Sequence, residues 1–490
     1  MEGRLGNMLI NNINSRKSRF LVALLSLLLT AAACYKDQGN YDISMPTTPI
    51  VSGLDTLYYA MVGDSLIIEP VIEGVSKEQL QFAWRIDVPE AVRPELNRYE
   101  GPALRIVFGL QAKRYTARLT LTDTGNGMKY FYAFKIQGNT AFSKGSLVLS
   151  EENGMTKLSF IKPDSTVQPN IYESINRESL PVAPLHLHFL RNQFTGNTPL
   201  GYWIITKNGG VRLDVNNLQK EEVKPGTLKD NFFLAPADVQ VGSLQNHPQG
   251  VLMGVLNGKF YGGTTTTWDQ SNTYGMFGTY ADGDYVLAPQ FVMSMINGNV
   301  SIIAFERNRK QFVRLNIYGA PMYFGTQYTP INTAVFDPTK LDMELMHIVQ
   351  INNSDTYAYM KARDGQVHEL KFNVNFNGPF TFTAAHKRVF KYAQFVDEET
   401  KMLSTRNGNI YIAHGSTLLR YNPISEQVTF LKTVFNAPIS MLKLDDDENT
   451  LLVGAGNSIY YLDIHVGRDG DLQGQIRGIP GKPIDMTWRK

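Results

Sequence analysis

The feature that most constrains the fold is a hairpin pattern that recurs between residues 141 and 490. Each copy is an alternating apolar run, a tight turn, and a second run, as in "LLVGAGNSIYYLDI" and "TYAYMKARDGQVHELKFN". Such runs, separated by Gly or Asn turns, predict antiparallel strand pairs. Seven turns fit the pattern, at Gly154, Gly209, Gly258, Asn308, Gly365, Gly415 and Gly456.

The spacing of these turns predicts how the hairpins assemble. Successive turns lie about 41 to 57 residues apart, close to the length of a four-stranded propeller blade. One blade cannot bury both of its faces, so blades stack around an axis. We therefore predict a seven-bladed β-propeller over 141–490, with the terminal "GKPIDMTWRK" adding a strand to the first blade and Trp488 packed between neighbours. A large β-sandwich or two smaller β domains would accommodate the same hairpins.

Residues 49–140 predict a separate β-sandwich. The run "YTARLTLTD" places Tyr115, Ala117, Leu119 and Leu121 on one face of a strand, and several short strands of this kind occur within about 90 residues. This pattern is typical of an immunoglobulin-like sandwich, in which Trp84 would be the central core residue. The chain as a whole is therefore expected to be all-β.

The N-terminus carries an export signal that ends at the only cysteine. The basic cluster at 16–19 precedes the apolar run "FLVALLSLLLTAAA", which is too short to span a bilayer comfortably. The three alanines before Cys34 resemble a bacterial lipobox, although Ala31 stands where leucine is commonest. We predict a signal peptide over 1–33, lipidation of Cys34 and a tether over 34–48. The alternative is an ordinary signal peptide with a stray thiol.

Charge and cysteine content exclude two classes of protein. Without residues 1–33 the chain has 43 basic and 44 acidic side chains, so it lacks the basic surface that nucleic-acid binding requires. A single cysteine cannot form an intramolecular disulfide, and the stability of the chain must come from its core.

Two strand motifs carry a family resemblance. The segments "QFAWRID" and "RYTARLTLTD" resemble a PKD-type sandwich, although "RIDVPEAV" replaces the usual Phe-Gly-Asp-Gly. Together with "CYKDQGNYD" they make the chain similar to the PKD-like family of Bacteroidetes outer-membrane lipoproteins. That resemblance implies a lipid-anchored protein exposed on the cell surface, which accompanies a SusC/SusD-like importer.

No motif predicts catalysis, a metal or another cofactor. The sequence lacks the local signatures of hydrolase nucleophiles, zinc proteases and phosphate-binding loops. His186 and His188 share a strand face, but no third ligand follows nearby. The acidic runs "LDDDEN" and "GRDGDLQG" lack full calcium-loop spacing and are read as solvated turns.

One long segment is the candidate binding site. "GGTTTTWDQSNTYGMFGTYADGDY" carries Trp268, Tyr274, Phe277 and Tyr280, and long structured loops are often functional. Exposed rings there would stack on a glycan or grip a peptide. The alternative is that these rings pack between blades.

Three functions remain open from the sequence. The first is a non-enzymatic surface lipoprotein that binds a nutrient, a glycan or a peptide. The second is a structural partner that docks on an importer. The third is a propeller glycosidase or lyase with acidic groups near the axis.

Overall fold

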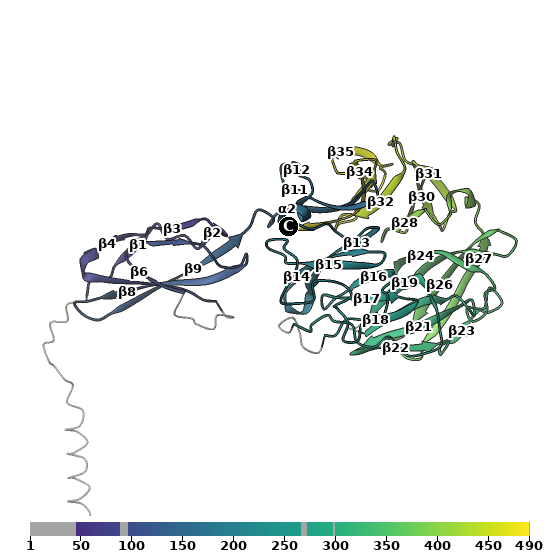
Figure 1. Ribbon diagram of the computed structural model, residues 1–490, viewed down its shortest axis with the longest axis horizontal. Coiled ribbons are helices and arrows are strands. Elements are labelled where there is room, and N and C mark those ends of the chain that lie inside the picture. Colours follow the sequence, from purple (N-terminus) through teal and green to yellow (C-terminus); the bar gives the residue numbers. More distant parts are fainter. Residues whose placement is uncertain (1–45, 89–96, 266–271, 297–298, 490) are drawn as a thin grey trace, which may run out of the picture. The chain divides into compact units, whose positions relative to one another are not determined.

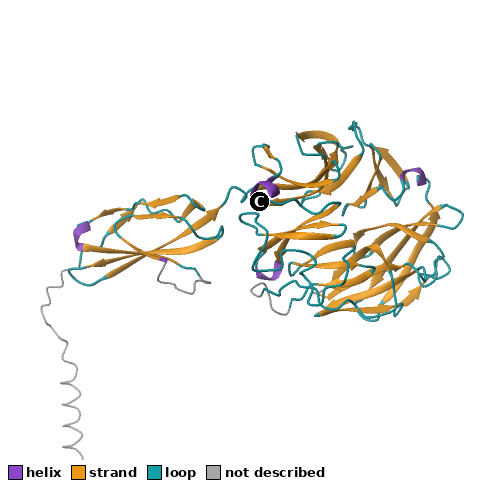
Figure 2. Ribbon diagram, viewed as in Figure 1, coloured by secondary structure: helices purple, strands orange, loops and turns teal. Residues whose placement is uncertain are grey.

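The computed structural model describes residues 46–88, 97–265, 272–296 and 299–489. Strands dominate these residues and helices are short (Figure 2). The prediction of an all-β chain is therefore confirmed. The predicted signal peptide and Cys34 lie outside the described residues. Each strand ladder lies either within β1–β9 or within β10–β36, and these two parts are described separately.

The first part is a sandwich-like arrangement of strands between residues 50 and 139. A five-stranded sheet has the order β2-β9-β8-β5-β6, and two shorter ladders pair β1 with β4 and β3 with β7. The strands are β1 (Ile50–Ser52), β2 (Leu57–Met61), β3 (Ser65–Ile68), β4 (Val71–Glu73), β5 (Leu80–Ile86), β6 (Arg98–Glu100), β7 (Leu104–Val107), β8 (Arg114–Asp123) and β9 (Lys129–Asn139).

The core of this part follows the predicted alternation. In β8, Tyr115, Ala117, Leu119 and Leu121 are buried, while the side chains between them are more accessible to solvent. Trp84 on β5 is almost fully buried, and its indole N–H donates to the carbonyl of Gly101 at 2.9 Å. A buried Trp needs such a partner for its polar atom. The role predicted for Trp84 is therefore confirmed.

The second part consists of seven sheets in the described residues. The first contains β10 (Gly145–Glu152), β11 (Met155–Ile161), β12 (Val167–Gln168) and β36 (Lys482–Arg489). The next three contain β13 (Pro184–Asn192), β14 (Thr198–Thr206) and β15 (Gly209–Leu213); β16 (Val241–His247), β17 (Val251–Leu256) and β18 (Lys259–Gly262); and β19 (Leu287–Ile296), β20 (Asn299–Glu306), β21 (Gln311–Tyr318) and β22 (Ala320–Gly325).

The remaining three sheets follow the same order along the chain. They contain β23 (Thr329–Ile331), β24 (Glu344–Asn352), β25 (Asp355–Lys361), β26 (Val367–Asn375) and β27 (Thr381–Val389); β28 (Lys401–Ser404), β29 (Ile410–His414), β30 (Thr417–Asn422) and β31 (Gln427–Phe430); and β32 (Ile439–Leu444), β33 (Thr450–Ala455), β34 (Ser458–Asp463) and β35 (Asp471–Arg477). The short α-helix α2 (Ile171–Asn176) follows β12.

All seven predicted turns are hairpin turns between paired strands. Gly154 lies between β10 and β11, and Gly456 lies between β33 and β34. In every sheet the predicted turn joins the second strand to the third, counted from the strand nearest the middle. The repeat seen in the sequence is therefore the repeat of the sheets.

The innermost strands of the seven sheets contact one another in cyclic order. Contacts run from β36 to β13, β16, β19, β24, β28 and β32, and from β32 back to β36. Figure 1 shows β13, β16, β19, β24, β28 and β32 around the middle of this part. We call β10–β36 the sheet ring. Its core lies between neighbouring sheets, as in the cluster formed by Phe312, Phe372 and Phe382.

The two ends of the sheet ring meet in one sheet. β36, the last strand, pairs antiparallel with β10, the first, and Val148 lies opposite Met486. Trp488 packs against a cluster that includes Val148 from the first sheet and Met441 from the last. Both predictions for the terminal segment are confirmed.

Asp485 on β36 links the sheets on either side of this closure. Its carboxylate is 2.6 Å from the Lys443 ammonium on β32 and accepts a hydrogen bond from the backbone N–H of Leu187 on β13 at 2.8 Å. Burial opposes ionisation of Asp485, but Lys443 and the Leu187 N–H together hold its pKa below its usual value. Asp485 is therefore ionised at neutral pH.

We expect Lys443→Met to destabilise the sheet ring by about 3 kcal/mol, because it leaves a mostly buried carboxylate without its cation. The matched control is Lys432→Met, which removes the Lys432–Asp471 pair, whose side chains are 65% and 41% exposed. That control should cost less than about 1 kcal/mol. Urea unfolding of the soluble chain measures both, and equal losses would contradict the role assigned to Asp485.

Candidate ligand cavity

A cavity of about 670 Å³ lies at the centre of the sheet ring. The innermost strand of every sheet contributes to its wall, so the cavity depends on all seven sheets being in place. Its polar and charged lining side chains are His186, Ser243, Gln245, Gln290, His347, Glu398, Thr400, Lys401, Ser440, Lys443 and Asp485. A concave site with a few convergent polar groups is the usual form of a ligand pocket.

Several of these polar side chains hold neighbouring sheets together. Gln245 on β16 donates to the Phe291 carbonyl on β19 at 3.2 Å, and Gln290 on β19 accepts from the Ile348 N–H on β24 at 3.0 Å. Ser440 on β32 donates to the Pro483 carbonyl on β36 at 2.6 Å. The innermost strands are thus joined by side chains and not by ladders. These side chains give the Phe291 carbonyl, the Ile348 N–H and the Pro483 carbonyl their hydrogen-bond partners.

The two lining histidines are neutral at neutral pH. Burial, and then the nearby lysines, keeps the pKa of His186 below its usual value, although Asp485 opposes the shift. Burial likewise lowers the pKa of His347, whose Nε2 lies 2.7 Å from the Asp397 carbonyl. Because a carbonyl only accepts, that Nε2 carries the proton.

His188 lies next to His186 on β13, with ring centroids 5.7 Å apart. Burial and the neighbouring His186 lower the pKa of His188 to about 3, so this imidazole is also neutral. Among the described residues, no group of three His, Cys, Asp or Glu side chains is placed to hold a metal ion.

Three polar groups of the wall retain unused hydrogen-bond donors within the described structure. The Lys401 ammonium and the Ser243 hydroxyl form no hydrogen bond or ion pair with any described residue. Gln290 uses its carbonyl oxygen on Ile348, which leaves its amide N–H groups free. These donors come from β28, β16 and β19.

The predicted aromatic site differs from what the structure shows. Tyr274 is buried, and its hydroxyl donates to the Gln249 carbonyl at 2.5 Å. Phe277 is fully buried against Phe232, with ring centroids 5.0 Å apart. The prediction of exposed rings is therefore wrong for Tyr274 and Phe277, because Phe277 packs in the core between two sheets and Tyr274 is buried with its hydroxyl bonded to the backbone.

The other two aromatic residues have different outcomes. Trp268 lies outside the described residues. Tyr280 is 41% exposed and lies edge-on to Tyr261, with ring centroids 5.7 Å apart. Ligand binding by Tyr280 stays a prediction. Its expected neighbours Tyr274 and Phe277 are buried and form no exposed platform with it.

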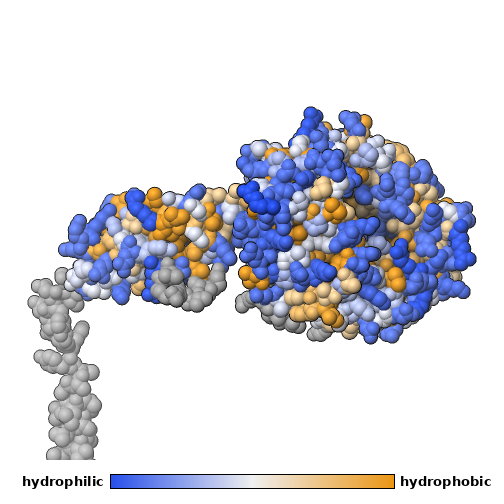
Figure 3. Space-filling model, in the orientation of Figure 1, coloured by the Kyte–Doolittle hydropathy of each residue, from blue (hydrophilic) through white to orange (hydrophobic). Residues whose placement is uncertain are grey.

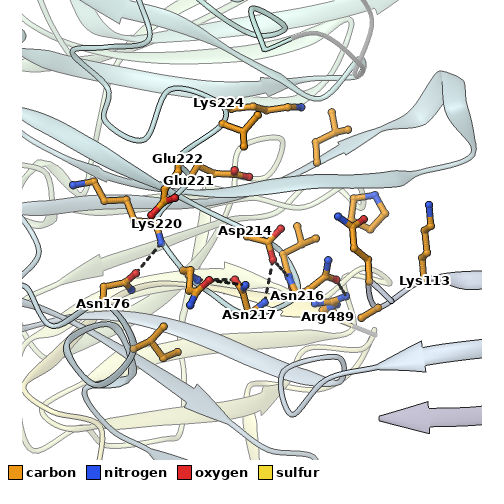
Figure 4. A pocket seen from close by; sticks show the side chains of 18 of the residues that line it. Lys113, Asn176, Asp214, Asn216, Asn217, Lys220, Glu221, Glu222, Lys224 and Arg489 are labelled. Carbon is orange, nitrogen blue, oxygen red and sulfur yellow. Dashed lines mark hydrogen bonds between the residues drawn. The ribbon is translucent and has the colours of Figure 1, made fainter. Parts of the chain in front are cut away.

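A second polar cluster occurs in the loop after β15 (Figure 4). There the Asp214 carboxylate accepts from the backbone N–H groups of Asn216 and Asn217 at 2.8 and 3.1 Å. The Asn176 side chain of α2 accepts from the Lys220 N–H at 2.8 Å. Because these groups satisfy one another, the cluster accounts for the conformation of the loop and is a weaker candidate than the central cavity.

The sequence reading missed the central cavity because its residues come from seven distant segments. A weak signal was present, since His186, Lys401 and Asp485 are polar residues on strands otherwise rich in apolar residues. Their shared position, on the innermost strand of a sheet, becomes visible only when the strand order is known.

The sequence comparisons support the N-terminal part of the resemblance. Residues 34–184 match the model of the PKD-like family, a segment that covers the sandwich and continues to the start of β13. No curated protein matches significantly. Within the described residues, no helix is both long and apolar enough to cross a membrane.

The structural comparisons give distant likenesses. A candidate 6-phosphogluconolactonase of Bacteroides fragilis is 11% identical, with a TM-score of 0.43, over 71% of this chain and 98% of that one. The β-propeller domain of Cps50 (Swd1) from Myceliophthora thermophila is 10% identical, with a TM-score of 0.37, over 60% and 87%. The extracellular domain of a hybrid two-component system of Bacteroides thetaiotaomicron is 12% identical, with a TM-score of 0.36, over 77% and 55%. At these scores the likenesses assign neither an activity nor a ligand.

Proposed function

We propose that this chain is a surface-anchored, non-enzymatic lipoprotein that binds a nutrient ligand, a glycan or a peptide, and delivers it to a SusC/SusD-like uptake system in the outer membrane. In this proposal Cys34 carries the lipid and the sandwich is a spacer. The sheet ring is a seven-bladed propeller, and its central cavity is the binding site. The observation that carries the proposal is that cavity, which is lined by side chains from all seven sheets.

The order of the sheets supports the propeller interpretation. Seven sheets whose innermost strands contact one another in a cycle, with the first and last strands of the chain segment joined in one sheet, match the expected construction of a closed propeller. Closure leaves only short strand edges exposed, and a central cavity is then a normal consequence of the architecture.

The state of Asp485 favours binding over catalysis. Glycoside hydrolysis uses two carboxyl groups with different protonation states on either side of the scissile bond. Asp485 is instead held ionised by Lys443 and by a backbone N–H, which suits a structural link. Glu398 is the other acidic side chain in the wall, and it is exposed.

A docking role is the second candidate, because some apolar side chains of the sheet ring are strongly exposed. Ile424 and Val466, from the sixth and seventh sheets, are 82% and 93% exposed. Polar residues nevertheless cover most of the face shown in Figure 3, and apolar residues form small groups on it. A docking surface is usually more continuous than this, so we place it second.

We expect Cys34→Ser to release the protein from the membrane. Wild-type protein should incorporate an alkynyl fatty acid and enter the detergent phase in Triton X-114 partitioning, because acyl chains add about 0.8 kcal/mol per buried CH₂. The Cys34→Ser variant should be unlabelled and remain in the aqueous phase. Ser44→Ala, in the predicted tether, is the control. Unchanged partitioning of Cys34→Ser would contradict the lipid anchor.

We expect Ser243→Phe to abolish ligand binding by filling the cavity. The soluble form, residues 36–490, would be screened by calorimetry against polysaccharides and peptide mixtures, and each bound ligand would be recovered and checked for cleavage. Affinity should fall at least about tenfold, since the ring occupies space that the ligand needs. Ser354→Phe, in an exposed turn, is the matched control.

Two outcomes of this screen would redirect the proposal. Binding that survives Ser243→Phe but is lost in Trp268→Ala or Tyr280→Ala would move the site to the aromatic segment. No binding to any member of the panel, with folding verified, would favour the docking role instead.

A further inference from the structure

The central cavity is lined by one lysine that forms no ion pair with a described residue. Of its two lysines, Lys443 is paired with Asp485 at 2.6 Å, whereas Lys401 has no ion pair within the described structure. Glu398 lies three residues before Lys401 in the sequence, yet the two side chains do not pair. Lys401, which is also exposed to solvent, therefore lines the cavity without a counterion among the described residues.

Lys401 acts electrostatically on two histidines of the wall. After burial, which is the largest cause, Lys401 contributes to the lowered pKa of both His186 on β13 and His347 on β24. Glu398 has no such effect on either histidine. With both histidines neutral and Asp485 paired with Lys443, Lys401 and Glu398 are the remaining charged side chains of the wall, and of these two Lys401 is the one that acts on the histidines.

The unused hydrogen-bond donors of the wall also favour an anionic ligand. The Ser243 hydroxyl and the Gln290 amide N–H groups have no acceptor among the described residues, and neither has the Lys401 ammonium. A lysine ammonium and an amide nitrogen donate and cannot accept. Hydrogen bonds from such donors are strongest when the acceptor is an anion.

We propose that the central cavity holds the anionic group of a small ligand, a carboxylate or a phosphate, with the Lys401 ammonium as counterion and Gln290 and Ser243 as hydrogen-bond donors. This inference rests on the proposed function, because it names the ligand chemistry of the same site. The anion would supply a counterion for Lys401 and acceptors for the Gln290 and Ser243 donors.

Calorimetry with matched pairs of ligands tests the charge requirement. The pairs are galacturonate and galactose, glucose 6-phosphate and glucose, and trialanine and its C-terminal amide. They separate uronates, phosphates and peptide carboxylates as sources of the anion. We expect at least one anionic member to bind, and its neutral partner to bind about 10- to 100-fold more weakly, the range for a charge-assisted hydrogen bond.

The Lys401→Met variant tests whether Lys401 is the counterion of the bound anion. It removes the charge and keeps a side chain of similar length. The affinity for the anionic ligand should fall by the same factor, about 10- to 100-fold. Lys340→Met, an exposed lysine away from the cavity, should leave the affinity unchanged. Equal binding of charged and neutral partners, both lost in Ser243→Phe, would overturn the anion site while the proposed function survived.

A crystal soaked in bromide tests the site without a known ligand. Anomalous scattering should place bromide in the cavity beside the Lys401 ammonium in the wild type and not in Lys401→Met. Bromide beside Lys401 supports the inference even if no member of the panel binds. A wild-type cavity free of bromide, together with no preference for anionic ligands, overturns it.

Discussion

The antiparallel pairing of β36 with β10 is the interaction on which the sheet ring depends. It joins residues from the two ends of a segment of about 345 residues, so it is a long-range contact whose loop-closure cost is high. Without it, the first sheet would lose its innermost strand and the last sheet would lose its neighbour. The cavity would then lack the wall that β36 supplies through Asp485. The closure and the candidate site therefore share the same strand.

Asp485 shows how charge reinforces this closure. A ladder joins β36 only to β10, whereas the Asp485 carboxylate also reaches β32 and β13. A partly buried carboxylate is costly unless it is paired and hydrogen-bonded, and here both conditions are met. Lys401 lies in the same cavity without such a partner. Lys401 is exposed, so water can solvate its ammonium in place of a protein partner.

In the aromatic segment, Tyr274 and Phe277 were predicted to be exposed and are buried. Its glycines and aromatic rings suggested an exposed platform, but the same residues suit a loop that folds back onto the core. Phe277 fills space beside Phe232, and the Tyr274 hydroxyl finds a backbone acceptor. Composition alone cannot separate these two outcomes, because a ring that binds a ligand and a ring that fills a core are the same side chain. Whether a ring is buried or exposed depends on the residues that lie next to it in the folded chain.

The local structure could be predicted from the residue pattern of each segment. Alternating residues and turn residues located the seven hairpins, the buried face of β8, the core position of Trp84 and the terminal strand, because strand period and turn chemistry act over a few residues. The cyclic order of the sheets, the Asp485 link and the convergence of Lys401, Gln290 and Ser243 were decided by the tertiary structure. These residues lie far apart in the chain, and no local pattern states which strands will be innermost. Their chemistry becomes a site only when seven separate segments meet around one cavity.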